Sequence, residues 1–320
     1  MFKKGSVQVS SYNELELIEF IKNWLGPTCL NSPKGIGDDC AIFDPKIKTK
    51  YLISTDSLIY KKHFDNSIKA KDVGRKLVLR NLSDIAAMGG LPEKATIAIC
   101  TSKNLSLNWL KNFYLGIKSS SIKYGLKIVG GDLAQSDDKS FQATMTIVGS
   151  TKNPILRHKS KLGNMIYVTG KLGGSILRKH YSFTPRIKEA SWIANNNFAS
   201  SMTDVSDGII KELRYLLKVN SSASIDLEKV PISSSAIRLS NNIESALEKA
   251  FSDGEDYELL FTLENNISKE KFEEQWGKKF PTTKLTNIGK IVKRFSHAEI
   301  INHKTNLEIK FKSSFDHFSR

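Results

Sequence analysis

The feature that most restricts the fold is a repeated pairing of a short apolar run with an aspartate. In five places such a run is followed by Asp next to Ser, Thr or Gly. These aspartates are Asp38 and Asp39 in GIGDD, Asp56 in ISTDS, Asp84 in NLSD, Asp132 in VGGD, and Asp204 and Asp207 in TDVSDG. Strand ends in α/β proteins converge at one edge of the sheet, where ligands bind. The pattern therefore predicts an α/β chain whose aspartates share one site.

A shared site places several negative charges close together. Two carboxylates ~5 Å apart repel by about 3 kcal/mol at an effective dielectric of roughly 20. Mg²⁺ removes this repulsion because it binds oxygen ligands from carboxylates, water and phosphate. The hydroxyls or main-chain carbonyls of Ser54 and Thr55 can complete its coordination shell. The aspartates therefore predict a site in which metal ions hold a polyphosphate.

Each aspartate also has an explanation that involves no ligand. Asp84 can form an ion pair with Arg80 one helical turn earlier, and Asp132 can belong to a glycine turn between strands. Ser206 and Asp207 can cap the helix that follows them. These explanations stay open for each residue taken singly, but the convergence of five similar settings favours the metal site.

Helix and strand patterns alternate along the chain and divide it in two. Helices are predicted over about 72–88 and 107–125, the second with Gly125 as its terminator. Strands are predicted in CAIF, YLIST, KATIAIC, LKIVGGD, FQATMTIVGS, MIYVTG and EDYELLFTL. The polar stretch 150–164 interrupts the apolar periodicity. We therefore expect an amino-terminal domain at 1–150 and a second mixed α/β domain at 151–320.

The charge of the chain is strongly basic, with 48 Lys and Arg against 33 Asp and Glu in 320 residues. A nucleic-acid site favours basic residues that gather in a patch or alternate with aromatic side chains. Here the lysines are spread from Lys3 to Lys312 with no run of five. We interpret the charge as a solvated surface with some attraction for polyanionic small substrates, and we expect no nucleic acid to bind.

The expected location is the cytoplasm. No segment reaches the roughly 20 consecutive apolar residues of a membrane span, and the first residues do not have the pattern of a signal peptide. Cys29, Cys40 and Cys100 form no CxxC pair, and their odd number fits reduced thiols.

The common phosphate-binding and nucleophile motifs are missing from the sequence. GxxxxGK[ST] is not formed, since Gly131 stands where lysine is required after Gly125 and Gly130. Protein-kinase motifs and a nucleophile elbow are also missing. The glycine-rich segment 168–175 follows a predicted strand, and it either places main-chain amides near phosphate or forms a tight turn. The aspartates remain the strongest functional signal.

Seven strings in the chain occur in the order found in thiamine-monophosphate kinase. They are GIGDDCAIF, STDSLIYKKHF, NLSDIAAMGGLPEKA, GLKIVGGD, YVTGKLGGS, TDVSDGI and GEDYELLFT. The chain resembles this kinase family from about Gly35 to the terminal FDHF, nearly its whole length. Aminoimidazole ribonucleotide synthetase, selenophosphate synthetase and a hydrogenase maturation factor share the fold and ATP use, but the chain resembles them less in these strings.

The resemblance implies a two-domain α/β fold of the aminoimidazole ribonucleotide synthetase-like kind. It also implies a homodimer whose amino-terminal halves pair through a shared sheet. The implied reaction transfers the γ-phosphoryl group of ATP to thiamine monophosphate with the help of several Mg²⁺ ions, giving thiamine diphosphate and ADP. Because donor and acceptor are both phosphates, bridging metal ions would offset their mutual repulsion.

The resemblance also assigns roles to residues by motif. The implied metal ligands are Asp38, Ser54, Thr55, Asp56, Asp84, Asp132, Asp204 and Asp207. The implied ATP contacts are Gly131, Arg157 and Ser206, and the implied thiamine monophosphate contacts are His63, Glu255 and Phe315. No residue is implied as a covalent nucleophile. On this assignment Asp38 holds metal and Asp39 shapes the turn behind it.

Some positions depart from the family pattern. Leu133 and Ala134 follow GGD where hydroxyl residues are common, and Asp253 stands where a glycine often precedes GEDYEL. Two alternatives stay open beside the kinase. One is another ATP-dependent enzyme of the same fold, such as an aminoimidazole ribonucleotide or selenophosphate synthetase, and the other is a basic nucleic-acid-binding protein.

Overall fold

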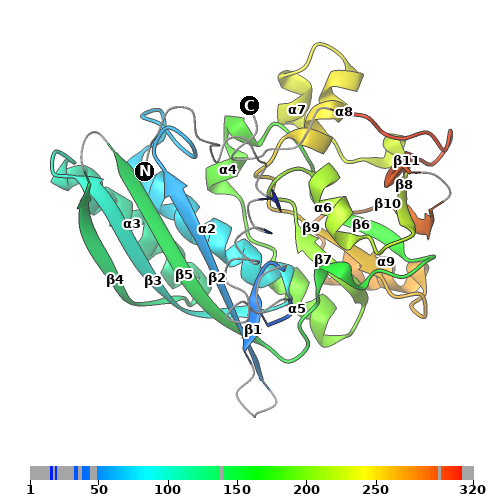
Figure 1. The fold of residues 1–320 in the computed structure, drawn as a ribbon, viewed down its shortest axis with the longest axis horizontal. Helices are drawn as coiled ribbons and strands as arrows, with labels where there is room; N and C mark the ends of the chain where they lie inside the picture. The colour runs from blue at the N-terminus through cyan, green and yellow to red at the C-terminus, as the bar shows by residue number, and fades with distance from the viewer. Residues whose placement is uncertain are drawn as a thin grey trace.

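Two β-sheets, with helices packed beside them, make up the chain (Figure 1). The computed structural model describes residues 15–16, 19, 32–34, 38–43, 49–136, 140–294 and 297–311. The mixed α/β fold class expected from the sequence is confirmed. Within the described ranges, no helix is long and apolar enough to cross a membrane.

The first sheet has five strands in the order β1-β2-β5-β3-β4. The strands are β1 (Ala41–Phe43), β2 (Lys50–Ile59), β3 (Leu91–Ser102), β4 (Lys127–Ser136) and β5 (Phe141–Thr151). Strands β3 and β4 run parallel, and the other neighbours are antiparallel. Buried and more exposed side chains alternate along β5. This alternation is expected when only one face of a sheet is covered.

Helices α2 (Ala70–Ala87) and α3 (Leu107–Tyr124) lie against the first sheet (Figure 1). Each helix has a glycine where the two cross. A Cβ atom on Gly74 would lie 1.9 Å from a main-chain oxygen of α3, and one on Gly116 would lie 2.0 Å from a main-chain oxygen of α2. The close packing of the two helices therefore depends on both glycines.

These two helices match the ones predicted over 72–88 and 107–125, and both predictions are confirmed. Helix α3 ends at Gly125, as expected, with a φ of 71°. This left-handed conformation favours glycine because a side chain would meet the following carbonyl.

The second sheet has six strands in the order β11-β8-β10-β6-β9-β7. The strands are β6 (Met165–Thr169), β7 (Ala199–Asp204), β8 (Ser221–Ile225), β9 (Leu259–Leu263), β10 (Leu285–Lys293) and β11 (Ile300–Asn302). Only β8 and β11 pair in parallel. The helices of this half are α4 (Lys179–Ser182), α5 (Ile187–Asn195), α6 (Ile209–Leu216), α7 (Ser234–Arg238), α8 (Ile243–Ser252) and α9 (Lys269–Lys279).

The hydrophobic core runs across both halves of the chain. One cluster joins buried residues of α2 and the first sheet to Ile187 and Ile193 of α5 and to the aromatic side chains Phe261, Phe272 and Trp276. Apolar burial of this kind is the main stabilising contribution to folding. Helix α2 therefore lies between the first sheet and the second half, where Figure 1 places it. The domain division at 150 stays a prediction.

Candidate active site

One face of α2 carries charged and hydroxyl side chains toward the second half of the chain. Lys76, Arg80 and the pair Ser83 and Asp84 follow one another at intervals of about one helical turn, which places them on the same side of the helix. The hydroxyl of Ser83 donates a hydrogen bond to Asp204 at the end of β7. This face of α2 is therefore in contact with a strand of the second sheet.

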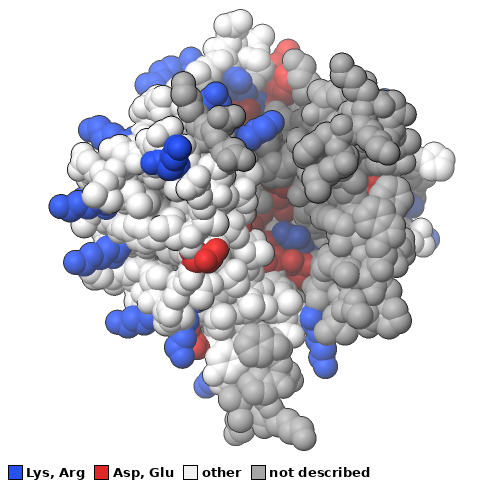
Figure 2. Space-filling view, turned by 60° about the vertical axis from the view of Figure 1, so that its left-hand side comes forward, with Lys and Arg blue, Asp and Glu red and all other residues white. Residues whose placement is uncertain are grey.

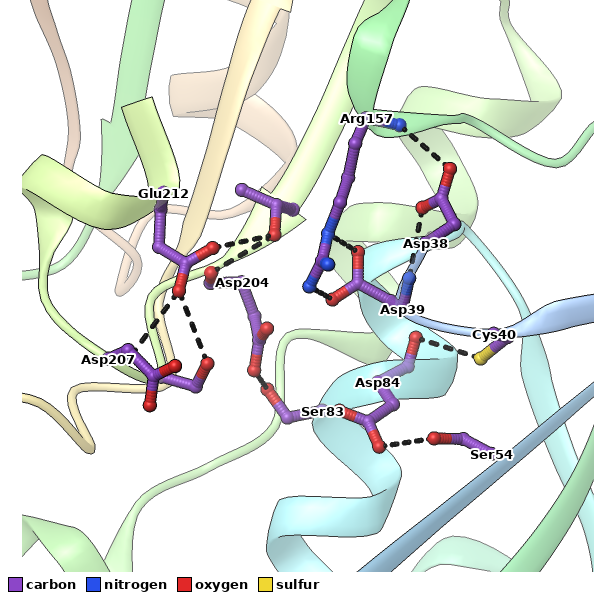
Figure 3. A network of polar contacts seen from close by, with 12 residues as sticks. Asp38, Asp39, Cys40, Ser54, Ser83, Asp84, Arg157, Asp204, Asp207 and Glu212 are labelled. Carbon is purple, nitrogen blue, oxygen red and sulfur yellow. Dashed lines mark hydrogen bonds and ion pairs between the residues drawn. The ribbon is translucent and has the colours of Figure 1, made fainter. Parts of the chain in front are cut away.

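Three carboxylates meet beside α2 (Figure 3). Asp39, just before β1, Asp84 on α2 and Asp204 on β7 each have a carboxylate oxygen within 4.8 Å of the other two. The Oδ1 atom of Asp204 is buried and has no hydrogen-bond partner among the described residues. Ser54 on β2 extends the group, since its hydroxyl donates a 2.7 Å hydrogen bond to Asp84 Oδ2. We call Asp39, Asp84 and Asp204 the carboxylate group.

Burial and mutual repulsion raise the pKa of the carboxylate group. Burial is the largest cause for Asp204, followed by the charge of Asp39, and together they raise the pKa of Asp204 to about 7. Burial also raises the pKa of Asp84 well above its ordinary value, with added repulsion from Asp56 and Asp204. Burial raises the pKa of Asp39, against the opposing charge of Arg157. Such an arrangement disfavours three bare anions.

A hard cation fits this arrangement. Its donor set consists of carboxylate oxygens and a hydroxyl oxygen, which Mg²⁺ prefers over nitrogen or sulfur ligands. The buried Oδ1 of Asp204, which has no partner in the described part of the chain, supplies an acceptor that a cation, a water or a donor from a ligand would satisfy. A bound cation would also lower the carboxylate pKa values.

Arg157 binds both aspartates of GIGDD. Its Nε donates to Asp39 Oδ2 at 2.8 Å, and its Nη2 also contacts the Asp39 carboxylate, whose side chain is 1% exposed. The main-chain N–H of Arg157 donates to Asp38 Oδ2 at 3.2 Å. Burial and the neighbouring Asp39 raise the pKa of Asp38 to about 6. The structure therefore places Asp39 inside the carboxylate group and Asp38 beside it. The sequence predicts the reverse, with Asp38 as the metal ligand and Asp39 as the residue that shapes the turn.

Strand β2 divides its predicted ligands between two faces. Asp56 forms an ion pair with Arg80, and it lies on the same face as Ser54. The Thr55 hydroxyl, on the other face, donates to a main-chain oxygen of β5 at 3.1 Å. The side chains of Ser54 and Asp56 therefore face α2, and that of Thr55 does not.

The loop after β7 contains Ser206 and Asp207. Lys211 binds the Asp207 carboxylate at 2.6 Å. Buried Glu212 accepts hydrogen bonds from the Ser206 hydroxyl at 3.3 Å and from the Asp207 main chain at 3.4 Å. Burial raises the pKa of Glu212 to about 8. Glu212 therefore holds this loop in place, a role that the sequence did not indicate.

His63 and Glu255 come together through Lys76. The ammonium group of Lys76 lies 2.8 Å from the main-chain oxygen of His63 and 2.6 Å from Glu255 Oε1. The Nδ1 of His63 accepts from the Ile59 main chain at 2.9 Å. Burial opposes ionisation of Glu255, but the hydrogen bond with His180 and the charge of Lys76 lower its pKa to about 2. Phe315, the third expected substrate contact, lies outside the described residues.

Gly131 and Asp132 lie on the edge strand β4, away from the carboxylate group. Pairing across the first sheet places Asp56, Met145, Ile97 and Gly131 in one row. Gly131 is therefore three strand spacings, about 14 Å, from Asp56. Within one chain, the predicted Asp132 ligand is not brought to the other acidic residues.

Comparisons with known proteins identify the family of the chain. The family model described as AIR synthase related protein, N-terminal domain, matches residues 37–151. Thiamine-monophosphate kinase of Buchnera aphidicola subsp. Schizaphis graminum is 36% identical over 96% of this chain and 99% of its own length. The chain belongs to the thiamine-monophosphate kinase family. Another member, from Haemophilus influenzae, is 32% identical over 88% of this chain and 91% of its own length.

Solved structures of this kinase family share the fold. The structure described as AaThiL complexed with AMPPCP and TMP has a TM-score of 0.81 and 26% identity, and covers 98% of this chain and 100% of its own. Hydrogenase maturation protein HypE in complex with ATP has a TM-score of 0.61 over 91% of this chain and 88% of its own. At 16% identity the second likeness concerns the fold alone.

Several residues of the site were not predicted. The sequence assigns Asp39 to the turn, because the conformation of the turn decides which of two adjacent aspartates faces the site, and the sequence does not determine that conformation. Lys76 had a usable signal, since it lies two helical turns before Asp84 on the same face of α2. His180 and Glu212 had no such signal, because their contacts depend on tertiary packing.

Proposed function

We propose that this protein transfers the γ-phosphoryl group of ATP to the phosphate of thiamine monophosphate, giving thiamine diphosphate and ADP. The observation that carries the proposal is the carboxylate group with its unpartnered Asp204 oxygen, in a chain of the thiamine-monophosphate kinase family. Further support comes from the related structure described as complexed with AMPPCP and TMP, which we take as an ATP analogue and thiamine monophosphate.

We propose Mg²⁺ as the cation of the site. The carboxylate group, with Ser54 as a neighbouring hydroxyl, would hold a first ion. The remaining expected ligands for further ions are Asp38, Thr55, Asp56, Asp132 and Asp207. When bound, Mg²⁺ supplies charge compensation between two phosphates that otherwise repel each other. The chain itself then positions the carboxylates, excludes water from Asp39 and Asp204 by burial, and uses no covalent nucleophile.

Arg157 and Ser206 are the proposed ATP contacts in this chain. The Arg157 guanidinium lies beside the carboxylate group and 4.6 Å from the centre of the Tyr215 ring, so its orientation is held from two sides. A guanidinium group has five N–H donors, so those that do not bind Asp39 can donate to phosphate oxygens. Ser206 begins the loop that Glu212 holds at the end of β7. Both groups would therefore orient the polyphosphate at the metal site.

His63, Glu255 and Phe315 are the proposed contacts for thiamine monophosphate. The thiazolium ring of this substrate carries a positive charge. Glu255 has a low pKa of about 2, so it is ionised at neutral pH, and its side chain is 28% exposed. An ionised and partly exposed carboxylate is suited to binding a cationic ring.

We also propose that the protein is a homodimer. The exposed side chains of the first sheet include Ile53 on β2 and Val129 on β4. Almost all of β4 is exposed, and the helices α2 and α3 leave the other face of the sheet uncovered (Figure 1). Pairing of two such sheets would bury this apolar surface. It would also let the partner's Asp132 complete a site from which Asp132 of the same chain is distant.

We also propose that the protein is located in the cytoplasm and does not bind nucleic acid. Figure 2 shows lysine and arginine side chains scattered over one face, with acidic and basic atoms together in a central hollow. Scattered charges of this kind favour a solvated surface over a nucleic-acid site.

Product identification tests the proposed reaction. The protein is incubated with ATP, MgCl₂ and thiamine monophosphate, and the thiamine phosphates are separated by chromatography. Thiamine diphosphate supports the kinase. Consumption of ATP without thiamine diphosphate would redirect the assignment to another ATP-dependent reaction of the same fold.

A further inference from the structure

Lys76 is a fully buried lysine at the junction of the two halves. Its side chain is 0% exposed, whereas the other lysine of α2, Lys71, is exposed. Burying an ammonium group costs several kcal/mol unless it is paired and hydrogen-bonded. An apolar side chain would fill the same volume without this cost. We therefore ask which contacts require the ammonium group of Lys76.

All three N–H donors of the Lys76 ammonium group have an acceptor. They are the main-chain oxygen of His63 at 2.8 Å, Nδ1 of His180 at 2.8 Å and Oε1 of Glu255 at 2.6 Å. An ammonium group has three donors and no acceptor capacity, so these contacts saturate it. An imidazole that accepts at Nδ1 carries its proton on Nε2. The contacts therefore fix the place of Lys76, and its contact with Nδ1 of His180 requires the Nε2–H tautomer, although the same Nδ1 also lies 3.4 Å from Glu255 Oε2.

The acceptors come from three separate parts of the chain. His63 follows β2 in the first half, and His180 belongs to the short helix α4 in the second. Glu255 lies in the turn before β9 with a φ of 63°, a left-handed conformation that is strained for a residue other than glycine. Such a conformation persists only where its surroundings hold it. Lys76 is one of the groups that hold the Glu255 carboxylate.

The neighbours of Glu255 are also anchored. Asp256 accepts a 2.7 Å hydrogen bond from the Gly173 main chain. Glu258 binds Lys179 at 2.8 Å and Arg186 at 2.7 Å. The residues that follow Glu255 are therefore anchored by Asp256 and Glu258, and Lys76 holds the Glu255 carboxylate itself.

We propose that Lys76 is a positioning residue that aligns Glu255 with His63 across the two halves and so determines how the acceptor substrate is held. This inference rests on the proposed function. Lys76 has no exposed surface, whereas the side chain of Glu255 is partly exposed. Lys76 therefore acts through Glu255 and does not itself contact thiamine monophosphate.

The kinetic test uses Lys76→Met, with Lys71→Met on the exposed side of α2 as the matched control. Misplacement of a substrate-holding group costs about 100-fold, so we expect kcat/KM for thiamine monophosphate to fall by about this factor in Lys76→Met. The KM for ATP should change by less than about twofold, because no ATP contact is involved. Lys71→Met should match the wild type. Equal losses for both substrates would overturn the inference.

A second variant keeps the test decisive if Lys76→Met does not fold. The double variant Lys76→Met/Glu255→Gln also removes the charge of the partly buried Glu255 carboxylate, which loses its Lys76 partner in the single variant. If Lys76 acts through Glu255, the double variant should have the same kcat/KM for thiamine monophosphate as Glu255→Gln alone, within about threefold. A further loss of about tenfold or more in the double variant would contradict the inference.

One measurement separates this inference from the proposed reaction. Nitrogen NMR of histidine-labelled wild-type protein reports the tautomer of His180 without any substrate, with His180→Gln used to assign the signal. A proton on Nε2 supports the Lys76 contact, and a proton on Nδ1 contradicts it. If the wild type formed no thiamine diphosphate, the proposed reaction would fail while the NMR result would still decide whether Lys76 is anchored as described.

Discussion

The Ser83 hydroxyl on α2 donates a 2.5 Å hydrogen bond to Asp204 on β7, although the two residues are 121 positions apart in the sequence. Ser83 directly precedes Asp84, and Asp204 and Asp84 belong to the same carboxylate group. The contact therefore holds the second half of the chain against the helix that carries the other half of the site. The carboxylate group exists only when the two halves are packed together.

Replacement of Asp84 tests the metal site. We expect Asp84→Asn to lower kcat by at least about 100-fold, as found when a group that stabilises transition-state charge is removed. The midpoint of thermal unfolding should not fall, since the substitution removes a charge that burial disfavours. Asp72→Asn, which affects a carboxylate paired with Arg75 on the same helix, serves as the control. Wild-type kcat in Asp84→Asn would contradict the account.

The stability of the metal-free protein should depend on pH in a defined direction. Burial raises the pKa of Asp204 from 3.8 to about 7 and that of Glu212 from 4.5 to about 8. The folded state therefore binds more protons than the unfolded state within these intervals, so the free energy of unfolding falls as the pH rises through them. Thermal unfolding in EDTA should occur at a lower temperature at pH 7.5 than at pH 5.

Magnesium should offset this loss of stability. Ligands that bind only the folded state stabilise it, and Mg²⁺ favours the ionised carboxylates present at the higher pH. Addition of MgCl₂ at pH 7.5 should therefore raise the unfolding midpoint more than at pH 5. A midpoint that Mg²⁺ leaves unchanged at both pH values would argue against the cation site.

The close approach of α2 and α3 can be tested by replacing two helical glycines with alanine, one at the crossing and one away from it. We expect Gly116→Ala to lower the free energy of unfolding by about 1–3 kcal/mol, because its Cβ would overlap the main chain of α2. Gly277→Ala in α9 meets no atom within 4 Å and should raise it by about 0.5–1 kcal/mol. Chemical denaturation of both variants measures the difference. Equal effects would show that the helices do not approach as described.

Mixing two inactive variants tests the proposed dimer. Asp84→Asn and Asp132→Asn should each be inactive as homodimers. If the partner's Asp132 completes the site, co-expression of the two variants with different affinity tags should give heterodimers that contain one intact site, so activity returns. Light scattering establishes the oligomeric state in parallel. Inactive heterodimers would place Asp132 in the site of its own chain or remove it from the site.

The long elements of the fold could be predicted from the sequence, and several short ones could not. Helix α3 has a clear apolar pattern and ends at Gly125, so its range was predictable. Strand β8 has the sequence SSASI, and all five of its residues are buried. Its serines are buried because tertiary packing covers both faces, so neither alternation nor apolar composition marks it as a strand.

The sequence predicts the chemistry of the site, which is a group of carboxylates, but it does not predict all of the residues that form it. Asp84 and Asp204 come together as the apolar-run pattern suggested. The choice between Asp38 and Asp39 depends on a turn that local propensity does not determine, and this turn directs Asp39 to the guanidinium of Arg157 and Asp38 to its main-chain N–H. Lys76 and His180 are 104 residues apart, and only the packing of α4 on α2 brings them within 2.8 Å.

The carboxylate group is proposed to serve the phosphorylation of thiamine monophosphate. Phosphorus NMR of the purified protein with ATP, Mg²⁺ and thiamine monophosphate tests this proposal, with controls that omit either thiamine monophosphate or the metal. We expect the signals of thiamine diphosphate and ADP to appear together, and only in the complete mixture. Intact ATP in the complete mixture, or ADP and inorganic phosphate without thiamine diphosphate, would contradict it.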